Sequence, residues 1–322
     1  MLSFLGLGFT IVATISLDGG TQMTNPPGPY PFVSDVSPEF RTDKLKERTS
    51  RDMFIIDFGC ERTEQEAAQF EKPFEYVLKN VRPDRKTNKR AAYRLRWWLH
   101  VEPRPAMRAA LAGLSRFVIT PTVAKHRVFA WAKAPTLPDH QLFVFAREDD
   151  YFFGVVHSRV HEAWALKKGT RLETRPRYTP TSTFETFPFP WPLNTPDEDL
   201  TAAQRKHRDA IAAAGKALDD QRGRWLNPPE LVREEPDIVA VLPSRLVPVS
   251  PEAGTELKKR TLVKLYNAKP AWLTMLHEAL NRVVLAAYGF ADGISDADLF
   301  QKVLKLNHER GKSPEVMAML HD

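Results

Sequence analysis

Cysteine is nearly absent from this 322-residue chain, which has one, Cys60. A single cysteine excludes a disulfide within the chain and a zinc site built on several thiolates. Such sparing use fits a reducing compartment, so we expect a cytoplasmic protein. Residues 2–17 are apolar, but they lack a basic leading segment and are too short to cross a bilayer. We predict buried strands there and no membrane partner.

Sequence signatures of common catalytic sites are also missing. The chain has no Gly-x-Ser-x-Gly, Walker or dinucleotide-binding motif. Two strings look like parts of a methyltransferase, Phe4-Leu5-Gly6-Leu7-Gly8 and Asn25-Pro26-Pro27-Gly28. The second has Gly28 where that motif needs an aromatic residue to stack on a flipped base. About 20 residues separate the strings, whereas a βαβ unit needs roughly 30. We therefore assign no catalytic and no cofactor-binding residue to this chain.

A metal centre is not indicated either. His157 and His161 are four residues apart on an expected helix, which is a spacing that can hold a metal ion. No third ligand is evident beside them in the sequence. We interpret the two histidines as a packing and hydrogen-bonding pair and predict no metal site.

Acidic residues are scarce in one stretch, residues 82–133. It holds thirteen lysines and arginines against Asp84 and Glu102, a net charge of +11. Because the whole chain carries +6, the remainder carries about −5. A basic block within an otherwise acidic chain is typical of a protein that binds a polyanion. The alternative is a solvated surface with paired charges, which the lack of acids in the block disfavours.

Hydrophobic periodicity predicts an α+β fold, with a mixed-sheet domain over residues 1–195 and an all-helical domain over residues 196–322. Strands are expected at 53–58, 117–120, 128–131, 142–146 and 151–156. Helices are expected at 63–69, 73–81, 104–114, 157–167, 197–225, 256–267, 270–288 and 295–307. Thr63 with Glu66, and Ser295 with Asp298, have the spacing of capping boxes. Residues 21–50 and 230–255 are expected to be loop and connecting arm.

Basic and aromatic residues alternate between Arg90 and His100, where Tyr93, Trp97 and Trp98 stand among arginines. Arginines neutralise phosphates, and aromatic rings can stack on bases or line a groove. The alternative is that both tryptophans belong to the core and only the arginines face solvent.

A series of strings in the chain resembles one known family. They are Tyr93–Pro105, Thr120–Phe129, Phe153–Trp164, Arg177–Pro190, Trp225–Pro229, Leu265–Trp272 and Ala286–Gly289. In this order they resemble the region downstream of the catalytic domain in type IIG/IIL restriction–modification enzymes, which are adenine-N6-specific class I DNA methyltransferases. The resemblance implies a DNA target-recognition domain followed by a helical C-terminal domain. It also implies that the S-adenosylmethionine site of the complete enzyme lies outside this chain, which is expected to be catalytically incomplete.

Double-stranded DNA is the partner that charge and resemblance together predict, with a separate methyltransferase chain as a further expected partner. The predicted phosphate-binding residues are Arg85, Lys86, Lys89, Arg90, Arg94, Arg96, Lys125 and Arg127. The resemblance implies that specificity is decided just before the segment that begins Arg177-Tyr178. The predicted base-reading residues are Lys167, Lys168, Arg171, Glu173 and Arg175. In that role an arginine favours guanine and a glutamate favours cytosine.

Other functions remain open at this point. Residues 197–322 could serve a helical interaction protein in which the basic block plays no part. The block could bind RNA, because charge does not distinguish the two nucleic acids. An autonomous S-adenosylmethionine-dependent methyltransferase using Gly6, Gly8 and Asn25 is the least favoured alternative.

Overall fold

The computed structural model describes residues 9–11, 32–34, 54–134, 136–138, 141–172, 175–236 and 244–311. The described strands are β1 (Phe9–Ile11), β2 (Phe32–Ser34), β3 (Phe54–Ile56), β4 (Arg116–Pro121), β5 (Ala130–Lys133), β6 (Leu142–Phe145), β7 (Thr170–Leu172), β8 (Arg175–Arg177), β9 (Val232–Glu235) and β10 (Arg245–Pro248). The described helices are α1 (Glu64–Ala68), α2 (Glu71–Asn80), α3 (Arg82–Lys86), α4 (Ala91–Leu95), α5 (Pro105–Leu111), α6 (Asp150–His157), α7 (Arg159–Lys168), α8 (Ala202–Leu226), α9 (Pro251–Leu257), α10 (Leu262–Ala268), α11 (Ala271–Ala287) and α12 (Asp296–Gly311), with a π-helical turn η2 (Pro180–Phe184) and a 3-10 turn η3 (Asp197–Asp199). The methyltransferase-like strings at residues 4–8 and 25–28 lie outside the described residues.

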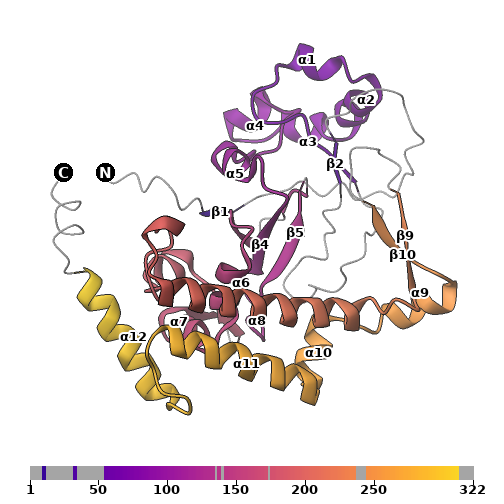
Figure 1. The fold of residues 1–322 in the computed structure, drawn as a ribbon. Coiled ribbons are helices and arrows are strands. Elements are labelled where there is room, and N and C mark those ends of the chain that lie inside the picture. Colours follow the sequence, from indigo (N-terminus) through magenta and orange to yellow (C-terminus); the bar gives the residue numbers. More distant parts are fainter. Residues whose placement is uncertain are drawn as a thin grey trace.

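A four-stranded sheet of order β1-β6-β4-β5 lies at the centre of the described fold (Figure 1). Side chains alternate across β4, so Phe117 and Ile119 join Met107 of α5 on one face while Val118 joins the large core on the other. The predicted α+β class is confirmed. The predicted mixed sheet is wrong for the described strands, whose pairings are all antiparallel. Short connections join β4 to β5 and β5 to β6, and a parallel pair would need a longer crossover.

The segment predicted as a strand at 151–156 is instead helix α6, which begins after Asp149. The Asp149 side chain accepts a hydrogen bond from the backbone N–H of Phe152, and this caps the helix. Residues Tyr151–His157 are all buried. A helix buried on every side shows no amphipathic period, so its apolar run has the composition of a buried strand.

Helix α8 is the long helix that runs across the molecule in Figure 1, and it packs against α6 and α11. Two glycines allow the close crossing with α6. A Cβ atom on Gly215 would lie 3.0 Å from the Cα of Gly154, and a Cβ on Gly154 would lie 2.7 Å from the side chain of Ile211. None of the described helices is long and apolar enough to cross a membrane.

The core is continuous across the predicted domain boundary at residue 195. One apolar cluster includes Val118 of β4, Ile211 of α8 and Val303 of α12. The fully buried Arg222 of α8 donates hydrogen bonds to the Phe129 carbonyl (3.0 Å) and to Nε2 of His157 (2.9 Å). The division into residues 1–195 and 196–322 stays a prediction, and across it the two parts share buried apolar and polar contacts.

A smaller body, which we call the α1–α5 unit (residues 57–111), has a core of its own between α1 and α4, while Met107 of its last helix packs with the sheet. That core includes Phe58, Val77 and Trp97. The predicted capping box at Thr63 and Glu66 is confirmed, as is the pair Ser295 and Asp298 before α12. The segment predicted as a connecting arm at 230–255 contains the β9–β10 hairpin. The single helix predicted at 256–267 is instead two helices, α9 and α10.

Candidate nucleic-acid interface

A short two-stranded hairpin, β7–β8, carries the centre of the predicted base-reading set. Arg171 pairs across the strands with Pro176, and Leu172 pairs with Arg175. Because successive side chains alternate between faces, Arg171 lies on one face of the ribbon, whereas Leu172, Arg175 and Arg177 share the other. Arg171, Leu172 and Arg177 are all exposed, with half of the Leu172 surface in contact with solvent. Both faces of this ribbon therefore present side chains to solvent.

Such a ribbon has no apolar face to bury, and an isolated two-stranded hairpin is at best marginally stable. Backbone contacts hold its base to the turn after β4. The Pro176 carbonyl accepts from the N–H of Ala124 (3.3 Å), the Tyr178 N–H donates to the Thr122 carbonyl (2.8 Å), and Val123 bridges to Arg177. On the other strand of the base, a Cβ on Gly169 would lie 2.6 Å from the carbonyl of Ala165 and 2.7 Å from that of Arg177, so glycine is needed where the chain leaves α7.

Arg127 adds a half-buried side-chain anchor. Its guanidinium donates to Thr120 Oγ1 (3.2 Å), to the Pro121 carbonyl and to the Pro176 carbonyl (3.2 Å). It also lies over the Tyr178 ring, 5.1 Å from the centroid. Burial lowers the pKa of Arg127 to about 10, so it remains charged at neutral pH. The structure therefore gives Arg127 a positioning role in place of the predicted phosphate contact, because its donors already bond to protein acceptors.

Tyr178 links this anchor to two buried histidines. The Tyr178 hydroxyl lies 3.0 Å from Nε2 of His161, whose Nδ1 lies 2.9 Å from the Val156 carbonyl. His157 bonds similarly: Nδ1 lies 3.1 Å from the Phe153 carbonyl, and Nε2 accepts from the Phe129 N–H. Each ring nitrogen thus has a protein partner, in a pattern that suits the neutral imidazole. Burial lowers the pKa of His161 to about 3 and that of His157 well below its usual value. We call Arg127, His157, His161 and Tyr178 the hairpin foundation.

The other predicted base-reading residues lie around the hairpin. Lys167 and Lys168 are in the last turn of α7, which leads directly into β7. Lys167 is exposed, and Lys168 Nζ lies over the Trp164 ring at 5.0 Å from the centroid. Glu173 falls outside the described residues. Lys125 is exposed in the β4–β5 turn, next to the residues that hold the hairpin base, and its Nζ donates to Asn267 Oδ1 (2.7 Å).

The remaining predicted phosphate-binding residues lie elsewhere, on α3 and α4 of the α1–α5 unit. Figure 1 draws these helices near the top of the molecule and α7 near the bottom. Lys86, Lys89, Arg90, Arg94 and Arg96 are exposed there. Several of these arginines bond locally, since Arg90 donates to the Tyr93 hydroxyl (2.7 Å) and Arg94 to the Asn88 carbonyl (2.6 Å). The structure therefore does not bring the predicted set together on one surface.

Arg85 is the second correction within that set. It is buried, its Nη1 donates to the Leu99 carbonyl (3.3 Å), and its guanidinium lies over the Tyr93 ring. Burial lowers the pKa of this side chain. Because the guanidinium packs inside the unit, we remove Arg85 from the residues expected to touch phosphate.

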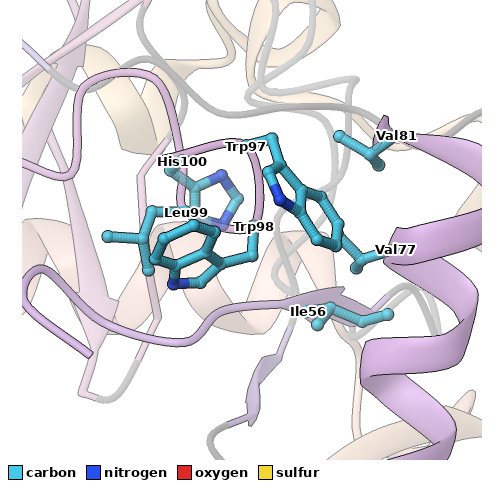
Figure 2. Close-up of a pocket in the computed structure, with 7 residues that line it drawn as sticks. All are labelled: Ile56, Val77, Val81, Trp97, Trp98, Leu99 and His100. Atoms are coloured by element: carbon cyan, nitrogen blue, oxygen red, sulfur yellow. The ribbon is translucent and has the colours of Figure 1, made fainter. Parts of the chain in front are cut away.

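The two tryptophans of the same unit face inward. Trp97 is buried, and Trp98 Nε1 donates to the Arg62 carbonyl (2.8 Å). Figure 2 shows both rings beside His100, Val77 and Val81 around a cavity of about 20 Å³. That volume suits about one water molecule, and no base could enter it. The alternative that both tryptophans serve the core therefore holds, and the arginines supply the unit's exposed charge.

Sequence reasoning missed Arg177, which shares a ribbon face with Arg175 and is exposed. The signal was present as an i, i+2 spacing, which places two residues of a strand on the same side.

The α+β body of this chain holds exposed arginines on a short ribbon that hydrogen bonds fix to the core, which is an arrangement suited to recognising another molecule. Side-chain donors on a rigid ribbon of this kind are suited to reading a grooved surface.

Comparisons with known proteins show which recognition proteins the chain is similar to. Residues 61–191 match the family of the target recognition domain of MmeI. A solved structure of the type IIL restriction–modification enzyme MmeI in complex with DNA superimposes with a TM-score of 0.58 at 16% identity, over 88% of this chain and 31% of that one. At this identity the likeness shows the fold. DNA methyltransferase A of Bacillus subtilis (strain 168) is 24% identical over 198 residues, which are 60% of this chain and 18% of that protein.

The resemblance predicted from the motifs is therefore confirmed, and the matched segment contains both the α1–α5 unit's basic helices and the β7–β8 hairpin. The chain spans less than a third of MmeI in that structure and less than a fifth of the curated relative.

Proposed function

We propose that this chain is the sequence-specific DNA-recognition part of a site-specific adenine-N6 DNA methyltransferase of the restriction–modification kind. Methyl transfer, with S-adenosylmethionine as the donor, would then be carried out by a catalytic domain supplied elsewhere, either in a longer protein or in a separate chain. The proposal rests on one observation. The segment that matches a target recognition domain contains an exposed basic ribbon fixed to the core by backbone hydrogen bonds and by the half-buried Arg127.

The ribbon suits a major groove, which is about 12 Å wide and admits a two-stranded β-ribbon. In this role Arg171 and Arg175, which lie on opposite faces of the ribbon, would contact base edges. Arginine can donate two hydrogen bonds to guanine, a pairing worth about 1–3 kcal/mol of discrimination. Lys125, Lys167 and the exposed residues of α3 and α4 would contact phosphates, which fix position and orientation without reading sequence.

Duplex binding by the purified chain tests the proposal. We expect a 30-base-pair duplex of mixed sequence to bind with a dissociation constant of about 1–100 µM near physiological salt, with a slope of about −0.9 per phosphate contact in log affinity against log salt. The double variant Arg171→Ala/Arg177→Ala should weaken binding by about 10-fold or more and make the slope shallower by up to about 2.

A matched control removes two exposed charges at the far end of α8 and in α9, Arg224→Ala/Lys258→Ala. This variant should bind as the original chain does. Absent or salt-independent duplex binding would overturn the proposal, and equal or tighter binding of an RNA duplex would favour the RNA alternative. Saturable binding of S-adenosylmethionine by this chain alone would favour an autonomous methyltransferase.

A further inference from the structure

Lys269 adopts a backbone conformation that favours glycine. It follows α10 with φ 46° and ψ 56°, the left-handed region, and its N–H donates to the Leu265 carbonyl (2.8 Å). Among the described non-glycine residues, Arg104 is the other with a positive φ. Glycine is the usual residue at this position because it has no Cβ to clash. A lysine here accepts a backbone cost, and such strain concentrates where a side chain has a function.

The end of α10 is joined to the turn that holds the hairpin base. Asn267 Oδ1 accepts from Lys125 Nζ (2.7 Å) and lies 2.9 Å from Nε2 of His126. The His126 ring also lies 6.0 Å from the ring of Tyr266. A segment of the helical part, residues 266–269, therefore lies beside the β4–β5 turn, although more than 140 residues separate the two in sequence.

Positive charge gathers at this junction. Lys125 and Lys269 are both exposed, and no carboxylate in the described part of the chain forms an ion pair with Lys269. Glu162 of α7 is an acidic side chain with which Lys269 interacts electrostatically. Glu162 is exposed as a whole, yet desolvation of its carboxyl raises its pKa, while Lys269, His126 and Arg127 oppose that rise. Lys269 therefore lies within electrostatic range of Glu162, which is next to His161 of the hairpin foundation in sequence.

We propose that Lys269 is a DNA phosphate ligand, and that the end of α10 completes on the helical side the interface begun by the hairpin. This proposal rests on the proposed function and adds the helical part to the DNA-binding surface. An ammonium is a compact point charge suited to a phosphate oxygen, and Lys125 and Lys269 would contact the same strand of backbone. If Lys269 had a purely structural role, it would instead interact with the dipole at the C-terminal end of α10 or with Glu162.

Substitution by glycine separates the two roles. Lys269→Gly relieves the backbone cost, so its melting temperature should equal or exceed that of the original chain. Its duplex affinity should fall by about 3- to 10-fold, with the salt slope shallower by about 1. Lys264→Gln, at an exposed lysine of the same helix, is the control and should change neither measurement.

Glu162→Gln gives an independent readout. If Lys269 faces a phosphate, removing the neighbouring negative charge should tighten duplex binding by about 2- to 5-fold. If Lys269 serves Glu162, this variant and Lys269→Gln should both lower the melting temperature and leave DNA affinity unchanged. Unaltered affinity and slope in Lys269→Gly would overturn the inference while the hairpin variants still supported DNA recognition. Absence of duplex binding by the original chain would overturn both proposals together.

Discussion

The basic residues of the α1–α5 unit lie on an apolar core, whereas those of the β7–β8 hairpin stand on buried polar groups. In the unit, Phe58, Val77 and Trp97 fill the interior, and arginines such as Arg90 and Arg94 bond to neighbours close in sequence. Under the hairpin, Arg127 and His161 bond to residues on other elements. The two regions thus carry similar positive charge, but one is supported by an apolar core and the other by hydrogen-bonded polar side chains.

The difference bears on what each surface can do. Side chains that bond locally on short helices are well placed to neutralise phosphates, which requires charge but little orientation. Reading a base edge requires a donor held in a defined direction, and buried hydrogen bonds at the base of a ribbon provide that rigidity. We therefore expect the hairpin to determine sequence preference and the α1–α5 unit to contribute affinity for any duplex.

Acid should weaken the hairpin foundation and its surroundings first. Burial lowers the pKa of His161 to about 3 and of His277 to about 4, and that of His157 falls well below its usual value. Because the unfolded chain takes up protons near pH 6.5 and the folded chain does not, stability is complete above pH 7 and falls as the pH drops toward 4. The three histidines together should remove roughly 4 kcal/mol of unfolding free energy between pH 7 and pH 5.5.

Urea denaturation at several pH values, followed by circular dichroism, measures this loss. His277→Gln should reduce the pH dependence by about one third, since it removes one of the three groups. In the original chain, Nε2 of His277 lies 3.0 Å from the Tyr266 hydroxyl, a contact that glutamine can retain. Stability that is unchanged over this pH range would contradict the neutral, buried histidines of the structure.

Removing the Arg127 anchor should have the next largest effect. Arg127→Met removes the donor to buried acceptors at Thr120 and Pro121 and one of the two donors to the Pro176 carbonyl, at a cost of about 2–3 kcal/mol in unfolding free energy. Apart from this loss of stability, the folded Arg127→Met variant should bind duplex with its salt slope nearly intact, because Arg127 itself is not expected to touch a phosphate.

Selection from a pool of randomised duplexes measures sequence preference, which a loss of stability alone would not change. The original chain should enrich a consensus sequence, whereas Arg127→Met should enrich little or none, and Arg127→Lys should recover part of the selection. A consensus from Arg127→Met identical to that of the original chain would show that the ribbon is held without this side chain.

Local signals in the sequence were sufficient for much of the fold. The caps at Thr63 and Ser295 depend on residues three positions apart: Thr63 and Glu66 form the reciprocal capping box, and Ser295 Oγ accepts from the N–H of Asp298. The run at 151–156 was mistaken for a strand because burial on all sides removes the helical period. Local patterns predict elements well when one face meets water, and poorly when none does.

The site was only partly predictable for a related reason. Lys125 and Arg127 are two positions apart in one turn, yet Lys125 is exposed and Arg127 bonds to Pro176, 49 residues away. Arg85 and Lys86 are adjacent, and only Lys86 is exposed. Sequence gives the number of charges in a block, whereas tertiary packing decides which of them reach solvent.

The smallest expected effect concerns the α1–α5 unit. Reversing two of its exposed lysines, Lys86→Glu/Lys89→Glu, should weaken duplex binding by about 10-fold at low salt, by less at 0.3 M salt because of screening, and equally for every sequence. Electrophoretic or anisotropy titrations with the selected consensus and a scrambled duplex would measure both affinities. Preserved preference for the consensus would support the division between the two surfaces. If the variant lost that preference, α3 and α4 would have to lie along the recognised bases. The α1–α5 unit would then also determine sequence preference, and the proposed difference between the two surfaces would be wrong.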